Sequence, residues 1–217
     1  MKSIFIFICT LFSLNLYSQQ DYFIFLNTNP DKEELSEERV NELHGQHLAN
    51  IDRLYKEGVI TAVGPFVGGG GIFIIHAPDE ETVWKHLKTD PAIRANRFNM
   101  EVHPMIIKSG KIYKIGDVYE MKQFAFARFK FEKPKNLPLK KDYTKDKHLK
   151  YMQSTSVADS LVLTSYFEDT RELVMIFNIS DNMKLEEVLK SHPLSKDQLM
   201  TYELKRLWIA KESFINE

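Results

Sequence analysis

The sequence predicts an α+β fold: two tandem ferredoxin-like units (β-α-β-β-α-β) packed sheet to sheet as an intramolecular pseudo-dimeric α+β barrel. An internal repeat is the first reason. His47 recurs as His148 and Phe66 recurs as Phe167 at one common spacing. That spacing, roughly 100 residues, is too long for a solenoid repeat and fits a duplicated small domain. The second reason is that both copies alternate strand-like and helix-like patterns in the same order.

In the first unit, turn residues separate the predicted elements. A strand leads through a proline turn into a long helix, which Gly58 ends as a C-terminal cap. Asp79 caps a second helix, and Pro91 prevents that helix from continuing. The predicted strands cover residues 22–26, 60–63, 72–77 and 100–107, and the helices cover residues 34–57 and 80–89.

The second unit repeats this order. Its predicted strands cover residues 124–131, 161–166, 173–179 and 201–209, and its helices cover residues 143–157 and 184–190. A four-stranded sheet with both helices on one face leaves its other face bare, and a domain of about 90 residues cannot expose that much apolar surface. Two such sheets facing each other bury it. The chain therefore divides into a signal peptide (residues 1–19), a first unit (20–111), a linker (112–121) and a second unit (122–217).

The overall composition is that of an ordinary folded protein. Hydrophobic residues make up 43% of the chain and charged residues 27%. The 29 Lys+Arg nearly balance the 30 Asp+Glu, which leaves a formal charge of −1. Such a balance gives no electrostatic attraction to nucleic acid or to an anionic membrane surface. We therefore expect neither of them as a partner.

The N-terminal segment has the features of a signal peptide. Lys2 supplies a positive charge, residues 4–16 form an apolar stretch, and a small residue precedes Gln19. The apolar stretch is shorter than the roughly 20 residues that a transmembrane helix needs. Cleavage would also remove Cys9, the only cysteine, and with it any disulfide, catalytic thiol or cysteine metal site. We expect a periplasmic or secreted protein with no membrane association after cleavage.

The first unit contains, in this order, His47, Gly58, Gly64-Pro65-Phe66, Gly71 and Asp90-Pro91. With these residues it resembles the YCII-related family of small α+β barrel proteins. In that family a histidine and an aspartate are proposed to face one cleft as a dyad, and the resemblance assigns these roles to His47 and Asp90. The second unit keeps His148 but has His192 in place of Asp90, so it resembles a diverged copy of the first unit.

The pattern and chemistry of these side chains are compatible with such a site. His44 and His47 lie near the centre of the apolar stripe of the first helix, so both are expected to point toward the sheet. A neutral imidazole beside a carboxylate is an acid–base pair suited to neutral pH, because the carboxylate fixes the tautomer and stabilises the imidazolium. We predict catalytic roles for His47 and Asp90, and small-molecule binding by His44, Gly64, Pro65 and Phe66.

The same residues also have purely structural explanations. His47 is equally explained as a packed barrel histidine, and an aspartate before a proline is a common helix N-cap. His44 and His47 have the spacing of two metal ligands on one helix, but zinc would need a third, so we predict no metal site and no cofactor. The run from Gly68 to Gly71 precedes a strand, which does not assemble the amide donors of a phosphate loop.

The leading hypothesis is an exported YCII-like protein whose first unit binds a small organic molecule. If the site is catalytic, His47 and Asp90 carry out a proton transfer in an elimination, isomerisation or lyase-type step. The alternatives are a non-catalytic ligand-binding or structural α+β barrel and, as a third class, haem binding through a histidine. Further assembly of the pseudo-dimer into homo-oligomers is left open.

Export predicts a defined mature N-terminus near Gln19. Intact-mass analysis of the protein recovered from the periplasm or the medium should give the mass of the chain without its leader. An intact chain that begins at Met1 and stays in the cytoplasm would contradict the signal-peptide interpretation.

Overall fold

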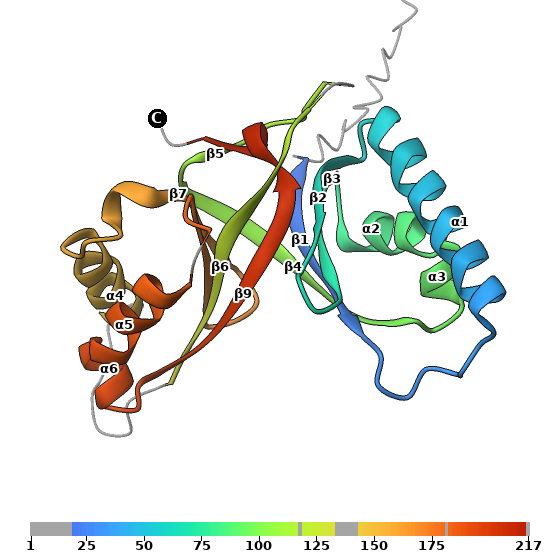
Figure 1. Ribbon diagram of the computed structural model, residues 1–217. Helices are drawn as coiled ribbons and strands as arrows, with labels where there is room; N and C mark the ends of the chain where they lie inside the picture. Colours follow the sequence, from blue (N-terminus) through green and yellow to red (C-terminus); the bar gives the residue numbers. More distant parts are fainter. Residues whose placement is uncertain (1–18, 117–118, 133–142, 181, 216–217) are drawn as a thin grey trace, which may run out of the picture.

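The structure is a computed structural model that describes residues 19–116, 119–132, 143–180 and 182–215. The predicted signal peptide lies almost wholly outside these residues. Among the helices of the described part, none is long and apolar enough to cross a membrane. Figure 1 shows strands in the centre of the molecule and one group of helices on each side.

The elements follow the predicted order in both units. The first unit consists of β1 (Gln20–Thr28), α1 (Glu37–Lys56), β2 (Ile60–Pro65), β3 (Gly71–Ala77), α2 (Glu80–Leu87), α3 (Pro91–Arg94) and β4 (Phe98–Ser109). The second consists of β6 (Met121–Phe131), α4 (Tyr143–Gln153), β7 (Leu161–Phe167), β8 (Glu172–Phe177), α5 (Met183–Ser191), α6 (Pro193–Lys196) and β9 (Met200–Ala210). The start of the linker forms β5 (Lys111–Ile112), which pairs with β10 (Phe214–Ile215).

A short helix follows each of two prolines. Pro91 stops the preceding helix and also begins α3, with Asp90 as the N-cap that an aspartate before a proline favours. In the second unit Pro193 begins α6 in the same way, with His192 as the N-cap. Proline suits a first helical position because its missing N–H has no partner to lose there. These two caps hold the side chains on which the functional comparison of the units depends.

The sheet order confirms the predicted barrel. The strands run β2-β3-β1-β4-β7-β8-β6-β9, so each unit contributes four adjacent strands and β4 pairs with β7 across the units. At the other edge, Phe66 forms a bridge with Leu207, and the Val67 N–H donates to the Arg206 carbonyl at 2.9 Å. The two four-stranded sheets thus face each other and meet at two seams.

Both seams depend on a glycine. A Cβ atom at Gly64 in β2 would lie 2.5 Å from the Trp208 carbonyl oxygen of β9. At Gly110, directly after β4, it would lie 2.0 Å from the Val162 carbonyl oxygen, and the backbone there has a φ of +80°. Any larger residue would push the strands apart or strain the backbone.

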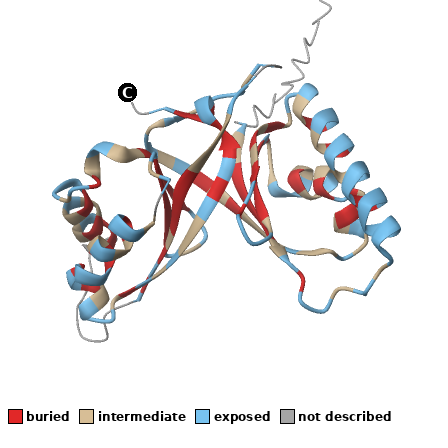
Figure 2. Ribbon diagram, in the orientation of Figure 1, coloured by how far each residue is buried: buried red, intermediate tan, exposed pale blue. Residues whose placement is uncertain are grey.

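Side chains alternate between the barrel interior and the helix layer. On β1, Phe23 and Phe25 point into the barrel, and Tyr22, Ile24 and Leu26 pack under the first unit's helices. The interior cluster joins both units, because Phe25 also contacts Phe126 and Phe167 of the second unit at ring-centroid distances of 6.0 and 5.8 Å. Buried residues therefore concentrate along the central strands and on the inner sides of the helices (Figure 2).

One polar network crosses the barrel between the units. Arg128 of β6 binds Glu101 of β4 through both terminal nitrogens, at 2.7 and 3.2 Å, and donates through Nε to Glu172 of β8 at 2.6 Å. Its guanidinium carbon lies 4.2 Å from the centroid of the Phe25 ring. Hydrogen bonding from Arg128 lowers the pKa of Glu101 to about 2. The network thus ties β4 of the first unit to β6 and β8 of the second.

The first unit should not be a stable monomer alone, because the second unit covers the apolar inner face of its sheet. A fragment of residues 20–111 would expose Phe23, Phe25, Ile72 and Ile74, and we expect it to self-associate or aggregate. Size-exclusion chromatography with light scattering, with the full chain as control, measures this. A stable, monodisperse monomer of the fragment would contradict the interdependence of the units.

Candidate functional site

Helix α1 positions His47 over the outer face of the first sheet. Ser36 caps this helix by accepting a hydrogen bond from the Arg39 N–H, and Leu43, Asn50 and Leu54 form its buried stripe. His47 lies at the edge of that stripe with its side chain 13% exposed. Its ring stacks on Phe73 of β3 with an interplanar angle of 22° and a centroid distance of 6.1 Å. Packing thus holds the imidazole in one orientation.

Asp90 lies against His47 and is almost completely buried, with 1% of its side chain exposed. One carboxylate oxygen, Oδ1, accepts from the backbone N–H groups of Ala92 and Ile93 at 2.9 and 3.3 Å, which caps α3. The other, Oδ2, lies 2.6 Å from Nδ1 of His47. Asp90 therefore holds the helix cap and the histidine contact simultaneously.

This contact determines which ring nitrogen is available for chemistry. A carboxylate only accepts hydrogen bonds, so the proton of a neutral His47 ring lies on Nδ1 and Nε2 is unprotonated. Nε2 has no hydrogen-bond partner among the residues that the structure describes, and it is not one of the fully buried unpaired atoms. The arrangement presents a basic nitrogen whose tautomer and direction are both set by the fold.

Sequence reasoning missed three residues that support the pair. Asn50 directs its amide nitrogen toward Asp90 Oδ2 at 3.4 Å, while its amide oxygen accepts from Thr89 and Arg53, each at 2.9 Å. Because both donors hold the oxygen, the amide cannot turn over and lose its contact with Asp90. Their positions in the sequence could have indicated this role, because Asn50 lies one helical turn after His47 and Thr89 directly precedes Asp90.

The corresponding pair in the second unit is sealed from solvent. His148 and His192 are both completely buried, and their facing atoms, Nδ1 of His148 and Nε2 of His192, are 3.1 Å apart. His192 accepts the Leu194 N–H on Nδ1, at 3.0 Å, so its own proton lies on Nε2 and is donated to His148. Nε2 of His148 is then a buried donor without a partner.

Burial keeps both of these histidines neutral. It lowers the pKa of His148 to about 3, with the neighbouring His192 as a smaller cause. It also lowers the pKa of His192 to about 4, with Lys147 as a smaller cause. The second pair is thus a packed, uncharged unit, unlike the reachable His47 with its carboxylate partner.

The structure separates the other predicted binding residues from this pair. His44 was expected to face the sheet, but it is exposed, because it lies one residue beyond Leu43 and therefore outside the buried stripe. Phe66 points into the barrel, where its ring contacts that of Phe126 at 5.0 Å, and Gly64 lies at the β2–β9 seam. Pro65 is exposed at the end of β2. Ligand binding by these four residues stays a prediction that the structure does not support with contacts to His47.

The barrel interior does not suit a haem group. Aromatic and aliphatic side chains from both units fill it, and His103 is the histidine that points into it. Both nitrogens of His103 face carboxylates, Nδ1 at 2.9 Å from Asp169 and Nε2 at 3.4 Å from Glu101. A haem macrocycle there would displace packed core side chains. His103 could become its axial ligand only by breaking its contacts with Asp169 and Glu101.

Comparison with known proteins agrees with the first-unit resemblance. Residues 21–106 match the YCII-related domain. The first unit thus contains a YCII-related domain, and the match ends before the second unit. No curated protein matches the chain.

Solved structures of similar fold extend across both units. A provisionally named chlorite dismutase is 11% identical, with 91% of this chain and 95% of that one covered and a TM-score of 0.54. A provisionally named monooxygenase from Fusobacterium nucleatum is 13% identical, with coverages of 92% and 94% and a TM-score of 0.47. A siroheme decarboxylase is 9% identical, with coverages of 89% and 72% and a TM-score of 0.47. At 11% identity, the likeness to the chlorite dismutase concerns the fold alone.

The buried histidine pair predicts acid sensitivity. In the unfolded chain these histidines titrate near pH 6.5. Below that pH the unfolded state binds more protons than the folded state, because burial lowers both pKa values in the folded state. Stability should be complete above pH 6.5 and fall as the pH drops toward 4, by about 2 kcal/mol per buried histidine at pH 5. Urea unfolding at successive pH values measures this.

The variant His148→Gln should flatten that pH dependence, although it lowers stability at pH 7 by disturbing the core. His44→Gln is the matched control, because His44 is exposed, and it should keep the slope of the parent chain. If the slope between pH 6.5 and 4 were unchanged in His148→Gln, the buried pair would not be its source.

Proposed function

We propose that this chain is an exported small-molecule-binding α+β barrel in which His47 transfers a proton and Asp90 orients it. The observation that carries the proposal is the 2.6 Å contact between Nδ1 of His47 and Oδ2 of Asp90, with Nε2 left without a partner among the described residues. Export is supported by the charge, apolar stretch and small residue at the start of the chain.

The chemistry is that of a general base or acid. In an elimination, Nε2 takes a proton from a carbon beside an electron-withdrawing group, the C–H electron pair forms the double bond, and the leaving group departs with the electrons of its own bond. In an isomerisation, His47 returns the same proton to another carbon. Asp90 lowers the cost of the charged imidazolium in both cases, because its carboxylate is already hydrogen-bonded to the ring.

We further propose that the second unit is a diverged YCII-like copy whose role is to complete the barrel. Its elements follow the same order, and His148 and His192 occupy the places of His47 and Asp90. With Asp90 replaced by His192, the pair lacks a carboxylate that could stabilise an imidazolium. Its complete burial also gives a substrate no route to the ring.

A substrate search comes first in the test of the catalytic role. Thermal-shift screening of the full chain against a metabolite library identifies binders, and mass spectrometry of incubated mixtures identifies those that are converted. With a converted compound, His47→Gln should lower kcat by roughly 10²–10⁴-fold, because the amide cannot take up a proton near neutral pH. Asp90→Asn should also lower kcat, because its amide oxygen can still cap α3 while its NH₂ faces Nδ1 and favours the opposite tautomer.

The matched control is His76→Gln. His76 also pairs with an aspartate, Asp21, through Nδ1 at 2.8 Å, but its side chain is 42% exposed and it lies on β3, not on α1. This variant should keep the parent kcat. Equal losses in His47→Gln and His76→Gln, or a loss in His47→Gln that only follows the fraction of unfolded protein, would sink the catalytic assignment. Binding without any conversion of the bound compounds would favour a non-catalytic binding protein.

A further inference from the structure

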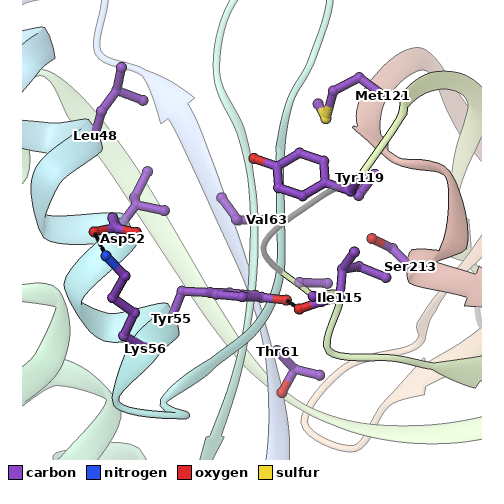
Figure 3. Close-up of a pocket in the computed structure, with 14 residues that line it drawn as sticks. Leu48, Asp52, Tyr55, Lys56, Thr61, Val63, Ile115, Tyr119, Met121 and Ser213 are labelled. Carbon is purple, nitrogen blue, oxygen red and sulfur yellow. Dashed lines mark hydrogen bonds and ion pairs between the residues drawn. The ribbon is translucent and has the colours of Figure 1, made fainter.

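A pocket of about 560 Å³ lies where the first unit, the linker and the C-terminal segment meet. We name it the junction pocket. Its described lining comes from α1, from β2, from the linker with the start of β6, and from the residues at and after the end of β9. Figure 3 shows α1 and the linker on opposite sides, with Val63 between them. Neither His47 nor Asp90 belongs to this lining, which uses an adjoining face of α1.

The walls are mainly apolar and aromatic. Ile51, Val63, Ile115 and Met121 contribute aliphatic or thioether surface, and Tyr119 adds an aromatic ring. Folding leaves part of this surface in contact with water, since Tyr119 is 55% exposed and Leu48 at the pocket is 51% exposed. A pocket of this size with predominantly apolar walls is typical of sites for small organic molecules.

One wall is held in place by a direct tie between α1 and the linker. The Tyr55 hydroxyl donates a hydrogen bond to the Ile115 carbonyl oxygen at 2.5 Å. The Lys114 ammonium lies 5.0 Å from the centroid of the same tyrosine ring. Since these contacts join residues 55 and 115, the pocket has its shape before any ligand enters, which lowers the entropic cost of binding.

The polar groups of the lining define the ligand further. Asp52 and Lys56 of α1 form an ion pair of 2.8 Å at the solvent-exposed rim. Ser213 is 2% exposed, and its hydroxyl has no hydrogen-bond partner among the described residues. Figure 3 shows that hydroxyl directed toward the pocket, opposite Tyr55. The hydroxyl oxygen is not one of the fully buried unpaired atoms, so a ligand in the pocket can reach it and complete its hydrogen bond.

We propose that the junction pocket is a second ligand site, separate from the His47–Asp90 pair, for an aromatic small molecule with one hydrogen-bonding group. The apolar walls receive the ring system and the Ser213 hydroxyl binds the polar group.

The neutral fluorescent probe N-phenyl-1-naphthylamine tests the site in the full chain, by fluorescence titration. It has two aromatic ring systems and one N–H group, which can donate a hydrogen bond to the Ser213 hydroxyl oxygen. We expect saturable binding to the parent chain. Gly116→Phe should weaken the affinity at least about tenfold, because a Cβ there meets no atom within 4 Å and the added ring takes space that the probe needs.

Two controls separate occupancy of the pocket from general disturbance. Gly45→Phe also places its Cβ in open space, on the exposed side of α1, and should bind the probe like the parent. Tyr119→Ala should weaken binding by about 2–10-fold through loss of an aromatic wall, whereas Tyr113→Ala, outside the lining, should not. The proposal is overturned if the parent shows no saturable binding, if Gly116→Phe and Tyr119→Ala both bind normally, or if the control variants lose as much affinity.

Discussion

The mutual covering of two apolar sheet faces is the constraint on which the rest of this structure depends. Neither four-stranded sheet can leave Phe23, Phe25 or Phe126 in water, so the sheets must face each other and their edges must meet. The edges meet closely enough that Gly64 and Gly110 tolerate no larger side chain. Once the barrel is closed, its interior is full. Functional groups are consequently left to the outer, helix-covered faces and to the junction between the units.

On those outer faces, the two units have different residues at the cap of the short helix. Asp90 and His192 each cap a four-residue helix that begins with proline, so both satisfy the local backbone. Asp90 also places its second carboxylate oxygen 2.6 Å from Nδ1 of His47. His192 offers a neutral imidazole in a buried site, which disfavours proton uptake by His148. Both units therefore cap a short helix, and they differ in the side chain that the cap places beside the histidine of the long helix.

Sequence patterns sufficed for features set by local periodicity and turn chemistry. The alternation along residues 22–26, the cap at Asp79 and the repeat of His47 as His148 predicted the strands, the helices and the paired units. Features set by tertiary contacts were missed or misplaced. The outward position of His44 depends on which apolar residues meet the sheet. The bidentate contact of Arg128 with Glu101 joins strands whose neighbourhood exists only after the barrel closes. Likewise, the sequence does not distinguish Asn50 from other polar helix residues, because its role depends on the hydrogen bonds from Thr89 and Arg53 that orient its amide.

The covalent link between the units has a structural consequence of its own. In a dimer of separate units the two outer faces would be equivalent, and no chain would cross from one unit to the other. Here the linker passes beside α1, where Ile115 accepts the Tyr55 hydroxyl, and β5 pairs with the C-terminal β10. Both contacts build walls that an untethered dimer would lack. Because the units are linked in one chain, the second need not have the same residues as the first. The link also creates a junction to which both units contribute.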